Sequence, residues 1–182
     1  MHEHLKQRVC EANLDLPRYG LVVFTWGNVS EIDREAGVVA IKPSGVSYDA
    51  LTADKIVLLD LDGKVLEGNL RPSSDTPTHL ELYRSFEAVG GICHTHSSHA
   101  TMWAQARRDI PCFGTTHADH FYGSVPVTEM MTPSEIREDY EANTGKVIVR
   151  RFRDLDPMQM PAVLVAGHGP FTWGKNAYYG QK

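Results

Sequence analysis

The chain has 182 residues, of which 42% are hydrophobic and 23% charged, and its formal net charge is −5. This length predicts one domain with a substantial hydrophobic core, and the acidic balance argues against nucleic acid as a partner. Charges run through the N-terminal segment, and no window approaches the ~18 apolar residues of a membrane span, so we expect a cytoplasmic protein without a membrane partner.

The first half of the chain is expected to contain two helices with strands between them. Apolar residues at helical spacing predict a helix over residues 3–14. β-rich runs predict strands over 38–42 and 56–60, and the turn pair Asp62-Gly63 then predicts a hairpin. A capping sequence followed by a proline predicts the second helix, over residues 76–89.

The second half continues this alternation. Four apolar runs predict strands over residues 92–96, 125–127, 147–149 and 162–166. A helix is expected over 99–107, and the capping-box spacing of Thr132 and Glu135 predicts another over 132–143. Because helices interleave with strands while hairpins are also present, we expect a three-layer α/β/α fold with a central mixed, largely antiparallel sheet.

The strongest local signal of chemistry is a pair of histidines one residue apart. His94 and His96 on a strand would point to the same face, where both could bind one metal ion. Two surface histidines on an edge strand are an even alternative from this spacing alone. His168 follows the apolar run 163–166 between two glycines, so it could add a third ligand at a strand end or be a plain turn residue.

Three short segments resemble anion-binding turns. Residues 26–28, 42–45 and 72–75 each place small or polar residues where backbone N–H groups are free for phosphate oxygens. Each segment alone is typical of an ordinary turn or helix cap. Together, and with Lys42 among them, they favour a small phosphorylated ligand, whereas the absence of a GxxxxGK[ST] loop argues against a nucleoside triphosphate.

Several other polar residues leave their role open. Asp119 could be a general acid or base, or it could cap a turn; Tyr178 and Tyr179 could donate protons or be inert. His79 shows no partner pattern and is expected, like His2 and His4, to have a surface or capping role. Glu141 could hold substrate or a neighbouring chain, but the sequence favours a solvated helix carboxylate.

Six motifs taken in order resemble the class II aldolase/adducin superfamily and, within it, the L-ribulose-5-phosphate 4-epimerases. They are FTWGN (24–28), IKPSGV (41–46), PSSDTPTH (72–79), HTHSSHAT (94–101), GTTHAD (114–119) and HGPFTWGKNA (168–177). The resemblance implies a single class II aldolase-like domain over residues 1–182 and a homotetramer with active sites at its subunit interfaces. Family members carry a helical segment that this sequence is expected to lack between Ala177 and Tyr178.

The resemblance also implies roles for individual residues. A divalent metal ion, zinc with Mn²⁺ as an alternative, is implied at His94, His96 and His168, with Asp75 beside them. The pocket for the substrate phosphate is implied at Asn28, Lys42, Ser44, Gly45, Ser73 and Ser74, with Thr115 also lining the site. Proton transfer is implied for Asp119 and for Tyr179, which in this family reaches the site of a neighbouring subunit.

The implied activity is epimerisation at C4 of L-ribulose 5-phosphate to D-xylulose 5-phosphate, by retro-aldol cleavage and re-addition. The alternative is an aldolase of a deoxyketose 1-phosphate of the fuculose or rhamnulose type. Asp75, where these aldolases have glutamate, and the GTTHAD segment favour the epimerase. A non-catalytic interaction module of the adducin type is disfavoured, because such modules do not keep the metal histidines.

Overall fold

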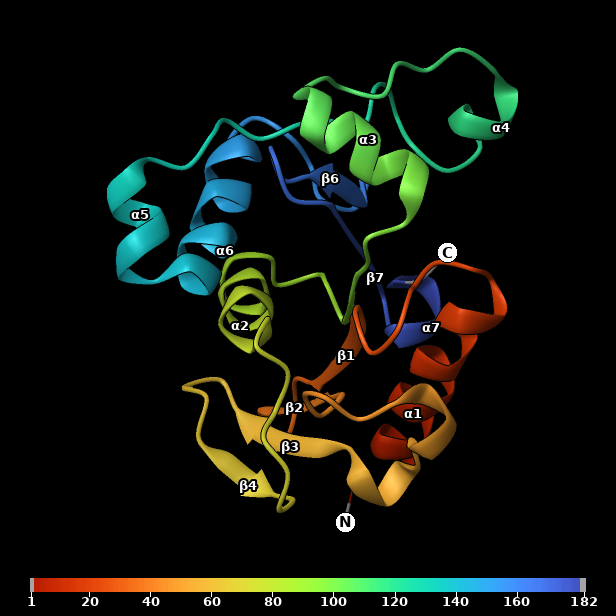
Figure 1. Ribbon diagram of the computed structural model, residues 1–182, viewed down its shortest axis with the longest axis vertical. Coiled ribbons are helices and arrows are strands. Elements are labelled where there is room, and N and C mark those ends of the chain that lie inside the picture. Colours follow the sequence, from red (N-terminus) through yellow and green to blue (C-terminus); the bar gives the residue numbers. More distant parts are fainter. Residues whose placement is uncertain (1, 181–182) are drawn as a thin grey trace.

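One seven-stranded sheet forms the centre of the protein, with helices on both of its faces (Figure 1). The computed structural model describes residues 2–180. The sheet is antiparallel in the order β4-β3-β2-β1-β5-β7-β6, and Val127 adds an isolated parallel bridge to Leu164. The strands are β1 (Asn28–Asp33), β2 (Val38–Ile41), β3 (Val57–Asp60), β4 (Val65–Glu67), β5 (Gly91–His94), β6 (Ala162–Leu164) and β7 (Pro170–Gly174). The predicted three-layer α/β/α fold is confirmed.

The helices divide between the two faces of the sheet. α1 (Glu3–Arg18) and α7 (Ala177–Gly180) pack on one face, whereas α2 (Thr76–Ser85), α3 (Ser98–Ala106) and α6 (Tyr140–Arg151) pack on the other. The shorter helices are η1 (Tyr48–Ala50), η2 (Ala53–Lys55), α4 (Thr115–Ala118) and α5 (Pro133–Glu138). None of the helices within residues 2–180 has the length and apolar character needed to cross a membrane.

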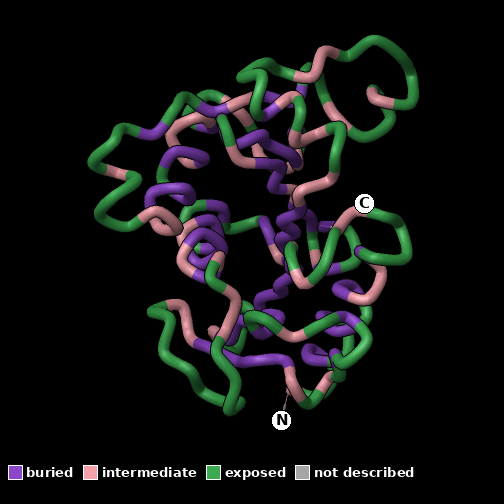
Figure 2. Tube along the Cα trace, viewed as in Figure 1, coloured by how far each residue is buried: buried purple, intermediate pink, exposed green. Residues whose placement is uncertain are grey.

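The two cores share the strands between them. Along β2, Val38 and Ala40 point into the core under α1, while Val39 and Ile41 point into the core under α2 and α6. Successive side chains on a strand face opposite sides, so a strand covered on both faces is apolar throughout. Figure 2 shows the buried residues along the strands and on the inner sides of the helices, whereas the loop that carries α4 is mostly exposed.

The strand predicted over residues 147–149 is wrong, because these residues belong to α6. Thr144, Val147 and Ile148 are buried at helical spacing and form the face of α6 that packs on α2. A Cβ atom at Gly145 would lie 2.6 Å from the Cβ atom of Glu81, so the two helices approach as closely as a glycine allows. Helix packing therefore overrides the strand preference of the Val147–Val149 run.

Other differences concern the ends of elements. The single helix predicted over 132–143 is two helices, α5 and α6, separated at Asp139, which has extended backbone (φ −158°) and caps α6. The strand predicted over 125–127 consists only of isolated bridges. α1 runs on to Arg18, with Pro17 in its last turn.

Candidate metal and anion site

A cavity of about 300 Å³ opens where the end of β5 meets the start of β1, the end of β2 and the start of α2. Residues from all three anion-binding segments and all three predicted metal ligands line it. The predicted site residues that it brings together are Asn28, Lys42, Ser44, Gly45, Ser73, Ser74, Asp75, His94, His96 and His168.

Three imidazoles meet at one end of this cavity. The Nε2 atom of His96 lies 3.1 Å from Nε2 of His94 and 3.0 Å from Nε2 of His168. The Nδ1 atom of His94 lies 2.9 Å from the carbonyl oxygen of Pro170, which can only accept a hydrogen bond. Nδ1 therefore carries the proton, and Nε2 of His94 presents its lone pair to the cluster. The predicted convergence of His94, His96 and His168 is confirmed.

The backbone brings the third histidine to the other two. β5 lies between β1 and β7 inside the sheet, so His94 is buried and the edge-strand alternative does not apply. His168 sits in the tight turn between β6 and β7, where its N–H donates to the carbonyl oxygen of Val165. A Cβ atom at Gly169 would lie 3.0 Å from the carbonyl oxygen of Thr95 and 3.3 Å from Cδ2 of His96. A side chain at this position would be tightly packed, so glycine favours the close approach of this turn to the His94–His96 segment.

The donor set of the cluster fits a divalent metal ion. Burial lowers the pKa of His94 and of His168 to about 3, so both imidazoles are neutral near pH 7. Three ring nitrogens this close together repel one another unless they share a cation or protons. Three imidazoles that leave further coordination positions open are typical of a catalytic metal centre. The carboxylate of Asp75 lines the same cavity but is not part of the three-histidine cluster.

Lys42 supplies positive charge to the same cavity. The residue is only 2% exposed, and within residues 2–180 no carboxylate forms an ion pair with it. Its ammonium group lies near the carbonyl oxygens of Thr25 and Pro43, 3.3 and 3.4 Å away. Burial lowers the pKa of Lys42 to about 8, so its ammonium group remains mostly protonated near pH 7. A buried cation without a counter-charge beside an open cavity is suited to an anionic ligand.

Backbone pairing holds the polar loops around Lys42 together. The N–H of Ser73 donates to the carbonyl oxygen of Lys42, and the N–H of Ser44 donates to that of Arg71. The side-chain nitrogen of Asn28 donates to Asp75 over 2.7 Å. The side-chain oxygen of Asn28 is buried and has no hydrogen-bond partner among the described residues, so it can accept a hydrogen bond from a ligand.

The predicted proton-transfer residues, Asp119 and Tyr179, do not line the cavity of the histidines. Asp119 and Tyr179 line a second cavity, of about 460 Å³, together with Trp173 of β7 and Lys175. Thr115 begins α4 and does not line the cavity of the histidines. Within one chain, these residues are therefore not brought to the metal cluster.

Sequence reasoning missed Tyr140 and did not favour a place in the site for Glu141. Tyr140 and Glu141, in the first turn of α6, line the cavity; burial, with smaller effects from the charges of Asp75 and Glu141, raises the pKa of Tyr140. The helix junction that places them becomes visible only in the folded chain. The expected surface role of His79 is wrong, because His79 is fully buried and its Nδ1 atom lies 2.7 Å from the hydroxyl of Ser30.

A family sequence model and several solved structures match this chain. The sequence model of the family described as "Class II Aldolase and Adducin N-terminal domain" matches residues 7–178. The structure of an L-fuculose 1-phosphate aldolase is 28% identical, with a TM-score of 0.80, over 98% of this chain and 79% of that one.

Two further structures resemble the chain at lower identity. One is YgbL from Klebsiella pneumoniae, described only as an aldolase/epimerase/decarboxylase; it is 24% identical, with a TM-score of 0.73, over 97% of this chain and 82% of that one. The other is a sugar-phosphate aldolase from Thermotoga maritima, 20% identical, with a TM-score of 0.73, over 100% of this chain and 90% of that one. At these identities the two structures support the fold alone.

Proposed function

Because this chain belongs to the class II aldolase and adducin family, we propose that it is a metal-dependent enzyme that breaks and re-forms a carbon–carbon bond of a sugar phosphate. Specifically, we propose that it epimerises L-ribulose 5-phosphate at C4 to D-xylulose 5-phosphate. One observation carries the general proposal: the three-histidine cluster and the unpaired Lys42 line the same cavity.

The cavity carries groups suited to a metal ion and groups suited to an anion, and a sugar phosphate offers oxygen atoms for the first and a phosphate for the second. We propose that Lys42, Ser44, Gly45, Ser73 and Ser74 bind the phosphate, with the free side-chain oxygen of Asn28 accepting from a substrate hydroxyl. The phosphate then anchors one cleavage product while its aldehyde turns to offer the opposite face.

His94, His96 and His168 would hold the metal ion, which we propose to be zinc, with Mn²⁺ as the alternative. A divalent ion bound there supplies a Lewis acid that polarises substrate oxygens. Asp75 lines the cavity beside them, where its carboxylate holds the amide of Asn28. We propose that Asp75 completes the surroundings of the metal ion.

Proton exchange with the C4 oxygen is assigned in this proposal to Asp119 and Tyr179, with Thr115 nearby. In one chain Asp119 and Tyr179 line the second cavity. The proposal therefore requires that a neighbouring copy of the chain bring its proton-transfer side chains to the histidine site. We therefore propose a homotetramer with active sites at its subunit interfaces, in which residues 1–182 act as one domain.

A second candidate is cleavage of a deoxyketose 1-phosphate, which the likeness to an L-fuculose 1-phosphate aldolase favours. Product analysis separates the two candidates. The zinc-loaded protein is incubated with L-ribulose 5-phosphate, and in parallel with L-fuculose 1-phosphate or L-rhamnulose 1-phosphate. D-Xylulose 5-phosphate from the first substrate supports the epimerase, and dihydroxyacetone phosphate from the others supports the aldolase. Neither product would contradict both.

A further inference from the structure

Tyr140 is the aromatic residue that α6 brings into the cavity of the histidines. It is half-buried: part of its ring packs on the hydrophobic core, and the residue also lines the cavity. The centre of its ring lies 5.8 Å from the centre of the His168 imidazole. Tyr140 therefore lies beside the histidine cluster within the cavity.

The start of α6 is held in place from two sides. The hydroxyl of Thr78 in α2 donates to the carbonyl oxygen of Glu141 over 2.6 Å, which fixes the first turn of α6 against α2. Close packing of Gly145 on Glu81 continues the same contact one turn later. Because α2 begins directly after Asp75, Tyr140 is fixed relative to the loop that carries Ser73, Ser74 and Asp75.

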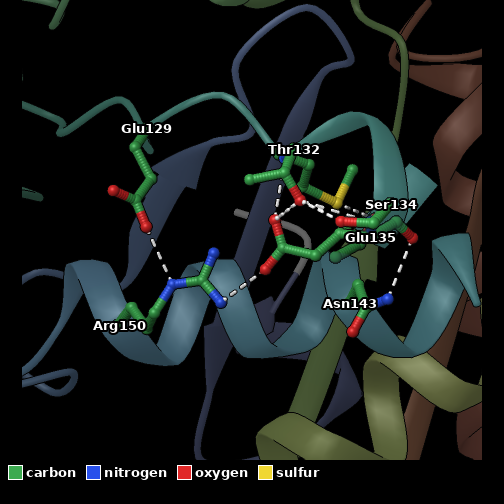
Figure 3. Close-up of polar contacts among 8 residues, drawn as sticks. Glu129, Thr132, Ser134, Glu135, Asn143 and Arg150 are labelled. Carbon is green, nitrogen blue, oxygen red and sulfur yellow. Dashed lines mark hydrogen bonds and ion pairs between the residues drawn. The ribbon is translucent and has the colours of Figure 1, made fainter.

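A polar clamp fixes the junction between α5 and α6 from the outside (Figure 3). Arg150 of α6 forms ion pairs with Glu129 and with Glu135, at 2.8 and 2.9 Å. Glu135 also closes a capping box with Thr132 at the start of α5. The amide of Asn143 donates to the backbone oxygen of Glu135 over 2.9 Å. Asn143 thus joins the first turn of α6, close to Asp139 and Tyr140, to α5, whereas Arg150 joins the last turn of α6 to α5 and to Glu129.

We propose that Tyr140 is a substrate-contacting residue of this site, whose phenolic hydroxyl donates a hydrogen bond to an oxygen of the sugar beside the histidine cluster. This inference rests on the proposed function and adds to it a specificity-determining group. A phenol held rigidly beside the cavity loses little conformational freedom when substrate binds, which makes its hydrogen bond effective.

The experiment compares Tyr140→Phe with Tyr19→Phe, which removes the hydroxyl of an exposed tyrosine at the end of α1. Zinc content is measured by atomic absorption. Calorimetry then gives the affinity of each zinc-loaded protein for dihydroxyacetone phosphate, which carries a carbonyl and a hydroxyl beside its phosphate, and for inorganic phosphate, which lacks both.

We expect Tyr140→Phe to weaken binding of dihydroxyacetone phosphate by about 10-fold, the effect of one lost hydrogen bond, and to leave zinc content and phosphate affinity within two-fold of the wild type. With an active substrate, kcat/KM should fall by about 10- to 100-fold. Tyr19→Phe should match the wild type in every measurement.

Three outcomes would overturn the inference. In the first, Tyr140→Phe binds dihydroxyacetone phosphate as tightly as the wild type does. In the second, the variant loses affinity for phosphate and zinc as much as for dihydroxyacetone phosphate, which indicates a structural role. In the third, the wild type does not prefer dihydroxyacetone phosphate over phosphate. The proposed function fails separately, when the wild type forms neither an epimerised nor a cleaved product.

Discussion

The ammonium group of Lys42 lies 4.9 Å from the centre of the Tyr48 ring, which in turn fixes the neighbouring loop through hydrogen bonds from its hydroxyl to the backbone oxygens of Trp26 and Gly27. An aromatic face offsets only part of the cost of burying a cation. Burial of this charge therefore costs stability, which in the proposed function is offset by the role of Lys42 in binding the phosphate.

Replacing Lys42 by methionine should stabilise the protein and weaken phosphate binding. Methionine has a similar volume and no charge to bury, so the free energy of unfolding at pH 7 should rise by about 1–2 kcal/mol. Affinity for inorganic phosphate should fall at least about 10-fold. Urea denaturation and calorimetry measure the two effects, and Lys146→Met, at an exposed position of α6, is the control.

The pH dependence of wild-type stability provides a second test of Lys42. Its pKa is about 8 in the folded protein and about 10.5 in the unfolded chain, so between these values the unfolded chain binds more protons. The contribution of Lys42 to stability should therefore rise from pH 8 to pH 10.5. Urea midpoints of wild type and Lys42→Met should converge over this interval; a constant difference would contradict the lowered pKa.

Loss of one imidazole should abolish metal binding without unfolding the chain. His96→Ala and His168→Ala each remove one of three nitrogen ligands, so zinc affinity should fall at least about 100-fold. His4→Ala changes an exposed histidine of α1 and should bind zinc as the wild type does. Competition with a chelator gives the affinities, and circular dichroism shows whether each variant is folded. Equal zinc affinity in all four proteins would exclude the cluster as the metal site.

A substitution that improves helix propensity should nevertheless destabilise α6. Alanine in place of Gly145 would gain about 1 kcal/mol of propensity in a helix interior. Its Cβ atom, however, would lie 2.6 Å from Cβ of Glu81, so α2 and α6 must separate, and such overpacking costs about 1–3 kcal/mol. We expect a net loss of stability in thermal or urea denaturation. Lys146→Ala, on the exposed side of the same helix, should cause little change; a more stable Gly145→Ala would contradict the close approach.

The capping box of α5 should contribute measurably to stability. Thr132→Val removes the oxygen that accepts the N–H of Glu135, and loss of such a cap costs about 1 kcal/mol. Thr132→Ser keeps a hydroxyl at the same place and should remain within about 0.3 kcal/mol of the wild type. Urea denaturation of the three proteins checks both values. A loss in Thr132→Ser with none in Thr132→Val would instead assign the effect to packing of the threonine methyl group, which valine keeps and serine lacks.

Local patterns predicted most of the fold, and tertiary contacts explain where they did not. The Val147–Val149 run has strand propensity, but Val147 and Ile148 become buried only because α2 offers a surface at helical spacing. The break between α5 and α6 at Asp139 could not be predicted either, because an aspartate is compatible both with a helix and with a cap at the start of a new one. Neither contact is encoded within the segment concerned.

The candidate site divides in the same way. Its histidines and Lys42 belong to short motifs whose chemistry can be recognised in sequence, and the structure brings them to one cavity. Tyr140 carries no such signal, because its place depends on how α6 packs on α2. The buried position of His79 likewise depends on its contact with Ser30 across the interface of α2 and β1.

The histidine cluster also constrains the order of events when the chain refolds. His96 and His168 are 72 positions apart in sequence, and they meet only when β7 pairs with β5. An unfolded chain can offer a metal ion His94 and His96 as neighbours, but the third ligand must wait for contacts of high sequence separation, which form slowly. Tight metal binding at this cluster would thus report that the central strands have assembled, and a bound ion would stabilise the finished structure.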